Sequence, residues 1–282
     1  MNLGPDFIGL GAQKAGTSWI YACLHEHPSI YIPEKEMHFF SRDRNWSKGW
    51  DWYAKRFNKA GSDQIKGEFS TSYLIDPAAS QRIAKHCSHS KLLVCLRNPV
   101  DRAWSGYMNH IRTGTIPKSC SFVEARNLQP DIIEHSRYSE QIQRYLDLSL
   151  GDRLVTLIYD DLNKNPRKFI SEIYRSLEVD EGYVPSHLNR KVNVARAPKS
   201  MLLEKGMTFI SEFLRKCRLE KLVWKIKSSN WPNRIRKWNT VPSRYAPQKM
   251  SASIREQLVQ TFEVDVQYVE NMTNRCFDEW RK

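Results

Sequence analysis

Residues 7–19, Phe7-Ile-Gly-Leu-Gly-Ala-Gln-Lys-Ala-Gly-Thr-Ser-Trp19, decide the fold of this chain. A short apolar run with the length of a buried strand leads into a loop with two glycines, Gly11 and Gly16, and a helical pattern follows directly. Glycine permits a tight turn, and the free N–H groups and dipole of the following helix attract an anion. Thr17 and Ser18 add hydroxyl donors there. The stretch therefore predicts a strand, an anion-binding loop and a helix.

The glycine spacing matches the phosphate loop of nucleoside triphosphate-binding proteins, G-x-x-x-x-G-K-[ST], with one displacement. Thr17 stands where the lysine belongs, and Lys14 lies inside the loop instead. A lysine at that place can reach the bridging oxygen of a leaving phosphate, whereas losing the Lys-Ser pair argues against a magnesium-bound triphosphate. The alternative is a strand-to-helix turn that binds nothing.

The rest of the chain repeats the alternation of strand and helix. Apolar runs predict four buried strands, at Phe7 to Leu10, Gln64 to Phe69, Leu92 to Leu96 and Leu154 to Tyr159. Helical patterns cover Thr17 to His25, Pro77 to Lys85, Pro99 to Arg112, Tyr138 to Leu148, Pro166 to Leu177 and Ser251 to Met272. This order predicts an α/β fold with a parallel sheet flanked by helices, whose ligands bind at the carboxyl ends of the strands. With 282 residues, 40% of them hydrophobic, we expect a single domain over residues 1–282.

A second anion site is predicted at Lys91-Leu-Leu-Val-Cys-Leu-Arg97-Asn-Pro-Val-Asp-Arg-Ala-Trp-Ser105. Here a buried strand ends in Arg97, and Asn98 and Pro99 form an N-cap with proline at the first helical position. Ser105 follows two turns into the helix, so its hydroxyl and the Arg97 guanidinium can converge on one anion. Arg97 could instead cap a neighbouring helix or pair with a carboxylate, but its place at a strand end before Asn-Pro favours the phosphate role. Two anion sites at strand ends predict a nucleotide with two separated phosphates.

Together, Gln13-Lys-Ala-Gly-Thr-Ser18 and Leu96-Arg-Asn-Pro-Val-Asp-Arg-Ala-Trp-Ser105 resemble the two signatures with which sulfotransferases bind 3'-phosphoadenosine 5'-phosphosulfate (PAPS). The resemblance is closest to the heparan-sulfate-type and bacterial carbohydrate sulfotransferases, and it covers about Asp6 to Leu177. It rests further on Pro33-Glu-Lys-Glu-Met-His-Phe-Phe40, Gly49-Trp-Asp-Trp-Tyr53, Gly67-Glu-Phe-Ser-Thr-Ser-Tyr73 and Ser136-Arg-Tyr138. The sequence departs from the heparan-type pattern at Phe69, where those enzymes have lysine, and at Ser136, where glycine is usual.

The resemblance implies a sulfotransferase fold with a P-loop-like nucleotide site and a transferase that moves a sulfuryl group from PAPS, without a metal, to a hydroxyl or amine of a carbohydrate-type acceptor. By the same resemblance the catalytic residues are Glu36, Lys14 and His38, with Glu36 as the general base and Lys14 beside the leaving phosphate. The implied nucleotide-binding residues are Gln13, Lys14, Ala15, Gly16, Thr17, Ser18, Arg97, Ser105, Tyr138 and Lys199.

Several of these residues have simpler interpretations. Glu36 alone could be a solvated surface charge, and His38 a hydrogen-bonded structural histidine. Phe39 and Phe40 are most simply core residues. Four large rings follow the proposed base, and they could stack on a sugar or build the core. These rings belong to Trp46, Trp50, Trp52 and Tyr53.

The net charge of +13 is concentrated in one segment. Residues 190–249 contain sixteen Lys or Arg against three acids, so the rest of the chain is neutral on balance. Met201 to Lys227 alternates apolar and basic residues at helical spacing, which predicts basic amphipathic helices in a helical C-terminal part. They could pack on the sheet with a solvated face, cover a glycan or glycolipid acceptor, or contact an anionic membrane.

The remaining features narrow the class of protein. The first apolar run begins at Phe7 and leaves no room for a secretory leader, and the six cysteines form no C-x-x-C pair, so we expect a cytoplasmic protein, peripheral at a membrane if the basic helices bind lipid. Two rivals stay open: a P-loop kinase, and a non-enzymatic binder of anionic membrane or nucleic acid. No nucleic-acid-binding motif accompanies the charge, so we expect no nucleic-acid partner.

Overall fold

The structure is a computed structural model of the chain, and it describes residues 4–189, 196–198, 240–242 and 249–282. The chain forms two compact units. The first contains Met1–Gly106, Arg126–Val192 and Met250–Lys282, and the second contains Tyr107–Ala125 and Asn193–Lys249. All the expected site residues except Lys199 lie in the first unit.

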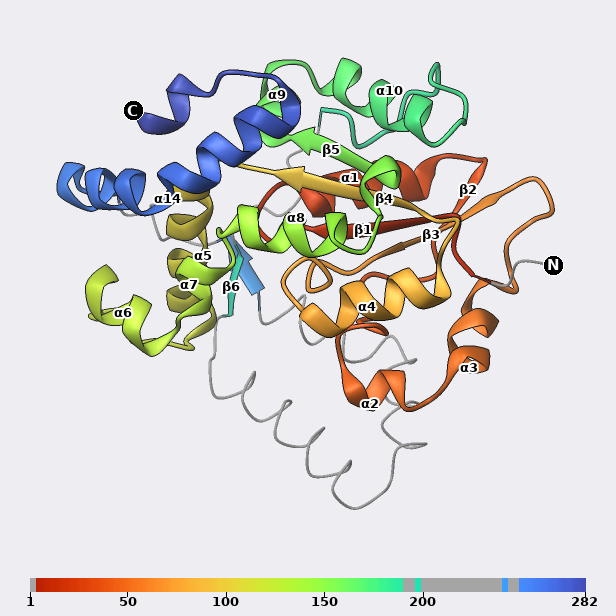
Figure 1. The fold of residues 1–282 in the computed structure, drawn as a ribbon, viewed down its shortest axis with the longest axis horizontal. Helices are drawn as coiled ribbons and strands as arrows, with labels where there is room; N and C mark the ends of the chain where they lie inside the picture. The colour runs from red at the N-terminus through yellow and green to blue at the C-terminus, as the bar shows by residue number, and fades with distance from the viewer. Residues whose placement is uncertain (1–3, 190–195, 199–239, 243–248) are drawn as a thin grey trace. The chain divides into compact units, whose positions relative to one another are not determined.

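A five-stranded parallel sheet forms the centre of the first unit (Figure 1). The strand order is β2-β3-β1-β4-β5, with β1 in the middle. The strands are β1 Phe7–Gly11, β2 Ile30–Tyr31, β3 Ile65–Phe69, β4 Lys91–Leu96 and β5 Leu154–Ile158. Because β1 has β3 on one side and β4 on the other, the loop after β1 lies at the switch point where ligands of such sheets bind.

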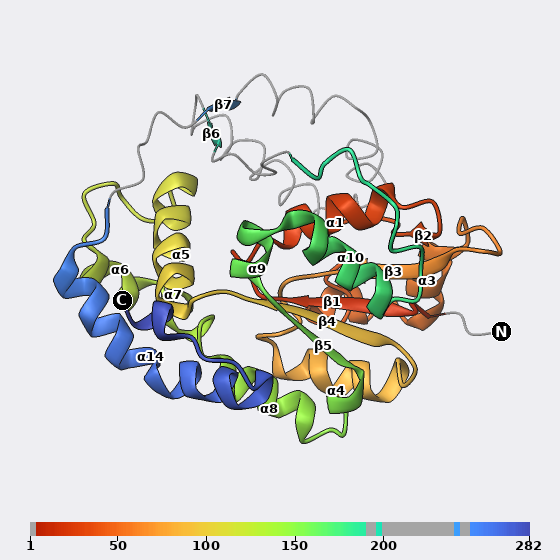
Figure 2. The ribbon, with the colours of Figure 1, turned by 90° about the horizontal axis from the view of Figure 1, so that it is seen from above.

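Helices cover both faces of this sheet. Figure 2 shows α1, α9 and α10 on one side and α4 and α8 on the other. The helices are α1 Thr17–Glu26, α2 Asp43–Trp46, α3 Trp50–Ala54, η1 Lys55–Phe57, α4 Pro77–His86, α5 Pro99–Thr113, α6 Phe122–Leu128, α7 Asp131–Glu134, α8 Tyr138–Leu146, η2 Gly151–Arg153, α9 Tyr159–Lys164, α10 Pro166–Ser176, α14 Ala252–Thr273 and η3 Asp278–Arg281. The fold class expected from the sequence, a parallel sheet flanked by helices, is confirmed.

The four expected strands and six expected helices are present with small shifts at their ends. The fourth strand ends at Ile158, and Tyr159 begins α9 instead of closing the strand. Helix α8 ends at Leu146, two residues before the expected end. The two-residue strand β2 and the short helices were not expected, because a segment of one or two turns contains too little periodicity to recognise.

Side-chain caps fix where several helices begin. The carboxylate of Asp76 accepts hydrogen bonds from the N–H groups of Ala78 and Ala79, and Pro77 follows it at the first helical position. The predicted caps behave in the same way: Asn165 accepts from the N–H of Lys168, and Asn98 accepts from that of Val100. The start of α5, which follows Arg97, is therefore held by its own sequence.

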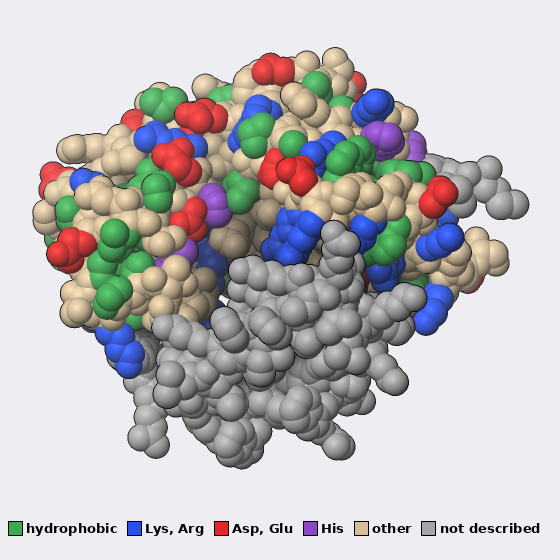
Figure 3. Space-filling model, turned by 90° about the horizontal axis from the view of Figure 1, so that it is seen from below, with side chains coloured by type: hydrophobic (Ala, Val, Ile, Leu, Met, Phe, Trp, Pro, Cys, Tyr) green, Lys and Arg blue, Asp and Glu red, His purple; other side chains and the backbone are tan. Residues whose placement is uncertain are grey.

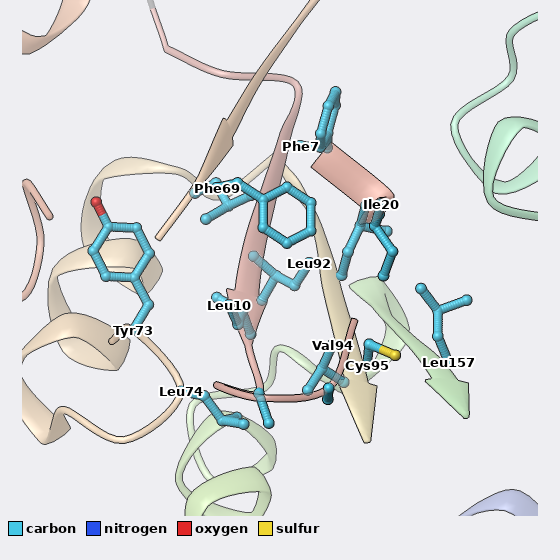
Figure 4. Packing of buried hydrophobic residues seen from close by; sticks show 14 of the residues in the cluster. Phe7, Leu10, Ile20, Phe69, Tyr73, Leu74, Leu92, Val94, Cys95 and Leu157 are labelled. Atoms are coloured by element: carbon cyan, nitrogen blue, oxygen red, sulfur yellow. The ribbon is translucent and has the colours of Figure 1, made fainter. Parts of the chain in front are cut away.

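The core lies between the sheet and the helices on its two faces (Figure 4). The ring of Phe69 covers Gly9 so closely that a Cβ atom at position 9 would lie 2.4 Å from it. Glycine in β1 is therefore required by packing, because any side chain there would displace a buried ring. The ring of Phe7, the side chain of Leu10 and Ile20 of α1 complete this part of the core.

In the second unit, the structure describes the end of α5, the start of α6 and two short strands. Strands β6 Arg196–Pro198 and β7 Thr240–Pro242 pair antiparallel. The hydroxyl of Tyr107 donates to the carbonyl of Cys120 at 2.7 Å. Lys199 and the expected basic helices of residues 201–227 lie outside the described residues. Within the described ranges, no helix combines the length and the apolar character needed to cross a membrane.

Candidate active site

The loop after β1 has the backbone of an anion site. Lys14 and Gly16 have φ angles of 73° and 77°, so the chain turns tightly before α1. The N–H of Ala12 donates to the carbonyl of Cys95 at 2.8 Å, which joins the loop to β4. No acidic residue lies in the first turn of α1, and no side chain caps its N-terminus. The free N–H groups of that turn are therefore left for a ligand.

The side chains of this loop differ in exposure. Ala15 and Thr17 are buried, Lys14 and Ser18 are partly exposed, and Gln13 is exposed. Ala15 can therefore contribute only its backbone to a ligand. The side chain of Gln13 points away from the core, and its Oε1 lies 3.3 Å from Nδ1 of His135.

Glycine at position 16 leaves room for an aromatic ring. A Cβ atom there would lie 2.8 Å from the ring of Tyr159, the first residue after β5. The guanidinium of Arg97 lies over the same ring, 5.1 Å from its centroid. Tyr159 therefore supports both predicted anion sites, although no sequence pattern singled it out.

The structure brings Arg97 against the glycine loop. Its Nη1 donates to the carbonyl of Lys14 at 3.2 Å, and the hydroxyl of the buried Tyr138 donates to the carbonyl of Arg97 at 3.0 Å. Ser105 lies two turns into α5 and is partly exposed. Lys14 and Arg97 thus lie in adjacent segments. The Tyr138 side chain contacts the backbone of Arg97.

Ser136, one of the two departures from the heparan-type pattern, has a structural partner. Its Oγ accepts from Nε of the buried Arg102 at 2.7 Å and donates to the carbonyl of Pro99 at 2.9 Å. Arg102 also donates to the carbonyl of Ile132. The serine therefore joins the start of α5 to the segment that precedes Tyr138.

Glu36 and His38 form one hydrogen-bonded group. Oε2 of Glu36 lies 3.3 Å from Nε2 of His38, and the hydroxyl of Thr71 donates to Oε1 at 2.9 Å. Nδ1 of His38 lies 2.7 Å from Oγ of Ser72, which in turn lies 2.7 Å from Oγ of Ser41. An imidazole that is protonated at Nε2 satisfies both contacts by donating to Glu36 and accepting from Ser72.

Burial lowers the pKa of His38, and the nearby cation of Arg42 lowers it further, while Glu36 acts in the opposite direction. The neutral imidazole is therefore the dominant form at neutral pH. Both side chains keep some exposure, 17% for His38 and 20% for Glu36, so the pair can meet a ligand.

Below this pair lies a buried carboxylate that the sequence did not single out. Glu68 accepts hydrogen bonds from the hydroxyls of Tyr53, Tyr73 and Ser70. Burial raises its pKa to about 7, against the effect of these hydrogen bonds, and the charge of Glu36 raises it further. The sequence does contain a signal for it. Glu68 lies inside a predicted strand, and four residues with hydroxyl groups, residues 70–73, follow the end of that strand.

The hydroxyls around Glu68 also hold the backbone of the neighbouring turn. Oγ of Ser70 accepts from the N–H of His38 at 2.9 Å, and the hydroxyl of Tyr73 accepts from the N–H of Phe39 at 2.8 Å. His38 has a φ of 49°, a left-handed conformation that costs a non-glycine residue energy. The network around Glu68 therefore fixes the turn on which Glu36 and His38 lie.

The aromatic residues after the turn belong to the core. Phe39 and Phe40 are fully buried, as expected. Tyr53 is buried too and stacks on Phe39 with ring centroids 4.3 Å apart. The three tryptophans, Trp46, Trp50 and Trp52, are partly buried and pack against the same cluster. Of the two interpretations left open, the structure favours the core for Tyr53 and a core edge for the tryptophans.

A cavity of about 730 Å³ opens beside the loop, between the start of α4 and the segment before α8. His135, which contacts Gln13, is one of its lining residues. Four carboxylates and two arginines also line it: Asp76, Asp131, Glu134, Glu140, Arg137 and Arg144. Basic and acidic side chains are likewise interspersed on the described part of the surface in Figure 3.

The sequence matches the family model described as "Sulfotransferase domain" over residues 4–230. It is 30% identical over 189 residues to mouse heparan sulfate glucosamine 3-O-sulfotransferase 5, a match that covers 58% of this chain and 54% of that protein. It is 31% identical over 153 residues to the membrane-associated sulfotransferase kil1 of Dictyostelium discoideum, covering 50% of this chain and 32% of the relative. The matches thus span about half or less of these relatives' length.

Among solved structures, the fold resembles that of a sulfotransferase from Alicyclobacillus acidocaldarius. The TM-score is 0.69, the sequence identity is 24%, and the comparison covers 99% of both chains. The fold is also similar to a sulfotransferase domain from the curacin biosynthetic pathway, with a TM-score of 0.51 over 68% of this chain and 80% of the other, at 14% identity. At these identities the similarity concerns the fold.

Proposed function

Because this chain belongs to the sulfotransferase domain family, which its family match over residues 4–230 shows, we propose that it transfers a sulfuryl group from PAPS to a hydroxyl or amine of a carbohydrate-type acceptor. The observation that carries the proposal is the hydrogen bond from Arg97 to the carbonyl of Lys14, since it joins two anion sites into one elongated site. A nucleotide with a 5'-phosphosulfate and a 3'-phosphate has the charge distribution that such a site fits.

The described residues that we assign to the donor are hydrogen-bond donors and cations, and none is assigned to a metal. The first turn of α1 offers backbone N–H groups and the hydroxyls of Thr17 and Ser18 to the 5'-phosphosulfate. Arg97 and Ser105 would bind the 3'-phosphate. When bound, the donor supplies the activated sulfuryl group. Lys14 then offsets the negative charge that develops on the leaving phosphate oxygen.

On the acceptor side, Glu36 removes the proton of the attacking hydroxyl or amine. Thr71 and His38 fix the direction of its carboxylate, and the neutral imidazole of His38 donates through Nε2 without competing for that proton. The new S–O or S–N bond forms as the bond from sulfur to the phosphate oxygen breaks, and the acceptor proton ends on Glu36. His38 is thus a positioning residue for the base.

The acceptor class rests on the relatives and on position 69. The names of two relatives specify heparan sulfate glucosamine, which supports a sugar acceptor, free or lipid-linked. Position 69, where the heparan-type pattern has lysine, is phenylalanine, so we propose an acceptor of lower negative charge than heparan sulfate. A cytoplasmic location, with peripheral membrane contact through residues 190–249, remains part of the proposal.

Calorimetric titration with 3'-phosphoadenosine 5'-phosphate (PAP), the product nucleotide, tests the donor site. We expect micromolar binding of PAP, weaker binding of ATP with or without magnesium, and about 10- to 100-fold weaker PAP binding in Arg97→Ala, since one or two charge-assisted hydrogen bonds are lost. Arg175→Ala is the matched control, because Arg175 pairs with Glu181 on the exposed side of α10. Preference for magnesium-ATP would replace this proposal with the kinase alternative.

A further inference from the structure

Lys35 lies between the two halves of the proposed site. Its backbone is paired in a parallel bridge with Phe69, the last residue of β3, so Lys35 is held at the carboxyl end of that strand. Its ammonium donates to Oγ of Ser18 at 3.1 Å. The ammonium also lies 5.7 Å from the ring centroids of both Tyr21 and Phe69.

The electrostatics of this position are unfavourable without an anion. Ser18 is the second residue of α1, where the helix dipole is positive and repels a cation. No carboxylate in the first turn of α1 offsets the ammonium, and Lys35 has no ion pair among the residues the structure describes. Burial lowers the pKa of Lys35 to about 8, and the charge of Glu36 only partly opposes this. A partly buried cation at a helix N-terminus is stabilised when an anion binds between the two.

The identity of that anion follows from the neighbours of Lys35 along the chain. Lys35 reaches Ser18 at the start of α1, whereas the next residue, Glu36, reaches Thr71 and His38. A group that touches Lys35 therefore lies between the donor loop and the proposed base. In the proposed reaction, that place belongs to the sulfuryl group in transfer.

We propose that Lys35 is a further catalytic residue, whose ammonium binds the sulfonate oxygens of PAPS and stabilises them as the sulfuryl group moves toward the acceptor. This inference rests on the proposed function. Lys35 exchanges no proton in the step: the acceptor proton goes to Glu36, and the bond that breaks joins sulfur to the leaving phosphate oxygen.

The test compares PAPS with PAP, which lacks the sulfonate. Lys35→Met keeps the length of the stem and removes the charge. We expect it to bind PAP within twofold of the wild type, to bind PAPS about 10-fold more weakly, and to lose about 100-fold in kcat, the range seen when one donor to a developing charge is removed. Lys91→Met is the matched control, because Lys91 begins β4 at the amino-terminal end of the strands, opposite the proposed site, and bonds Ser176 and Glu178.

The pH profile gives a readout that a structural role would not alter. Since the pKa of free Lys35 is about 8, wild-type affinity for PAPS should be highest below pH 8 and fall above it, while affinity for PAP should not follow this profile. The titratable groups around Lys35 are Glu36 and the phenol of Tyr21, whose pKa is raised by burial and further by the charge of Glu34. Lys35→Arg should extend PAPS binding to higher pH, since guanidinium stays charged.

The outcomes separate the two proposals. If the wild type binds neither PAP nor PAPS, the proposed function fails. If it binds both and Lys35→Met keeps the wild-type ratio of PAPS to PAP affinity and its kcat, the role of Lys35 is refuted while the function stands. Should Lys35→Met show no cooperative unfolding transition, the wild-type and Lys35→Arg pH profiles decide the question.

Discussion

The glycine loop of residues 11–18 and the turn of residues 35–41 both lie at the carboxyl ends of the strands. Different kinds of contacts hold the two segments in their conformations. The loop is shaped by its backbone: the positive φ angles of Gly11, Lys14 and Gly16, an N–H bonded to Cys95 and the packing of Tyr159 on Gly16. The turn is held by side chains from β3 and the residues after it, centred on the buried Glu68. Substitutions should therefore affect donor binding through the first region and turnover or stability through the second.

The sharpest test of this difference is Glu36→Gln. It removes the proposed base without removing volume, so we expect kcat to fall by about 1,000-fold, within the usual range for general-base catalysis, while the Kd for PAP stays within twofold. Glu178→Gln, a change of an exposed carboxylate, should leave both unchanged. Steady-state kinetics and calorimetry measure the two quantities. A fully active Glu36→Gln enzyme would refute the assignment.

Glu68 should make stability depend on pH. Its pKa is about 7 in the folded protein and near 4.5 when exposed, so the folded state binds its proton more tightly. Folding stability should then decrease as pH rises from 4.5 to about 7, by at most about 3 kcal/mol, and stay level above. Glu68→Gln should show a smaller decrease between pH 5 and 7.5 in urea or thermal unfolding. An equal decrease in both proteins would contradict the role of Glu68.

Comparing Tyr73→Phe with Tyr53→Phe distinguishes hydroxyl contacts that hold the turn of residues 35–41 from contacts that stabilise only the core. Both lose a hydrogen bond to Glu68, so each should lower the free energy of unfolding by about 1–3 kcal/mol. Only Tyr73 also accepts from the N–H groups of Phe39 and Phe40. Its loss should lower kcat severalfold more than the loss of the Tyr53 hydroxyl does, with PAP affinity unchanged in both. Equal kcat values would show that the network does not position Glu36.

The smallest effect is expected for Gln13→Ala. The side chain of Gln13 is exposed and only approaches His135, so the loop keeps its backbone when the side chain is removed. PAP affinity should change less than twofold by calorimetry. A tenfold loss would show that Gln13 binds the nucleotide through its side chain, and that the loop does not bind through its backbone alone.

The sequence allowed prediction of the regions whose structure is local. The strand-loop-helix unit at Phe7 to Glu26 and the capped helix after Asn98 follow from residues within a few positions of each other, and both were found where expected. The closeness of Glu36 and His38 was predictable too, because they are two residues apart.

What the sequence did not reveal depends on contacts between distant residues. Glu68 meets Tyr53 across 15 positions, and Lys35 meets Ser18 across 17. Tyr159 packs on Gly16 only because β5 adds to the sheet beside β4. Periodicity describes one element at a time, so it carries no signal for a bond that forms when separate strands align.

The position of Tyr159 links the nucleotide site to the outermost strand. Strand β5 lies at the edge of the sheet and pairs only with β4, and Tyr159, whose ring contacts Gly16 and Arg97, follows β5 directly. Edge strands commonly open before the global unfolding transition. A nucleotide bound to the loop after β1 should therefore slow amide hydrogen exchange in residues 154–158. Exchange in the outermost strand, β5, would then report whether the nucleotide site beside the central strand is occupied.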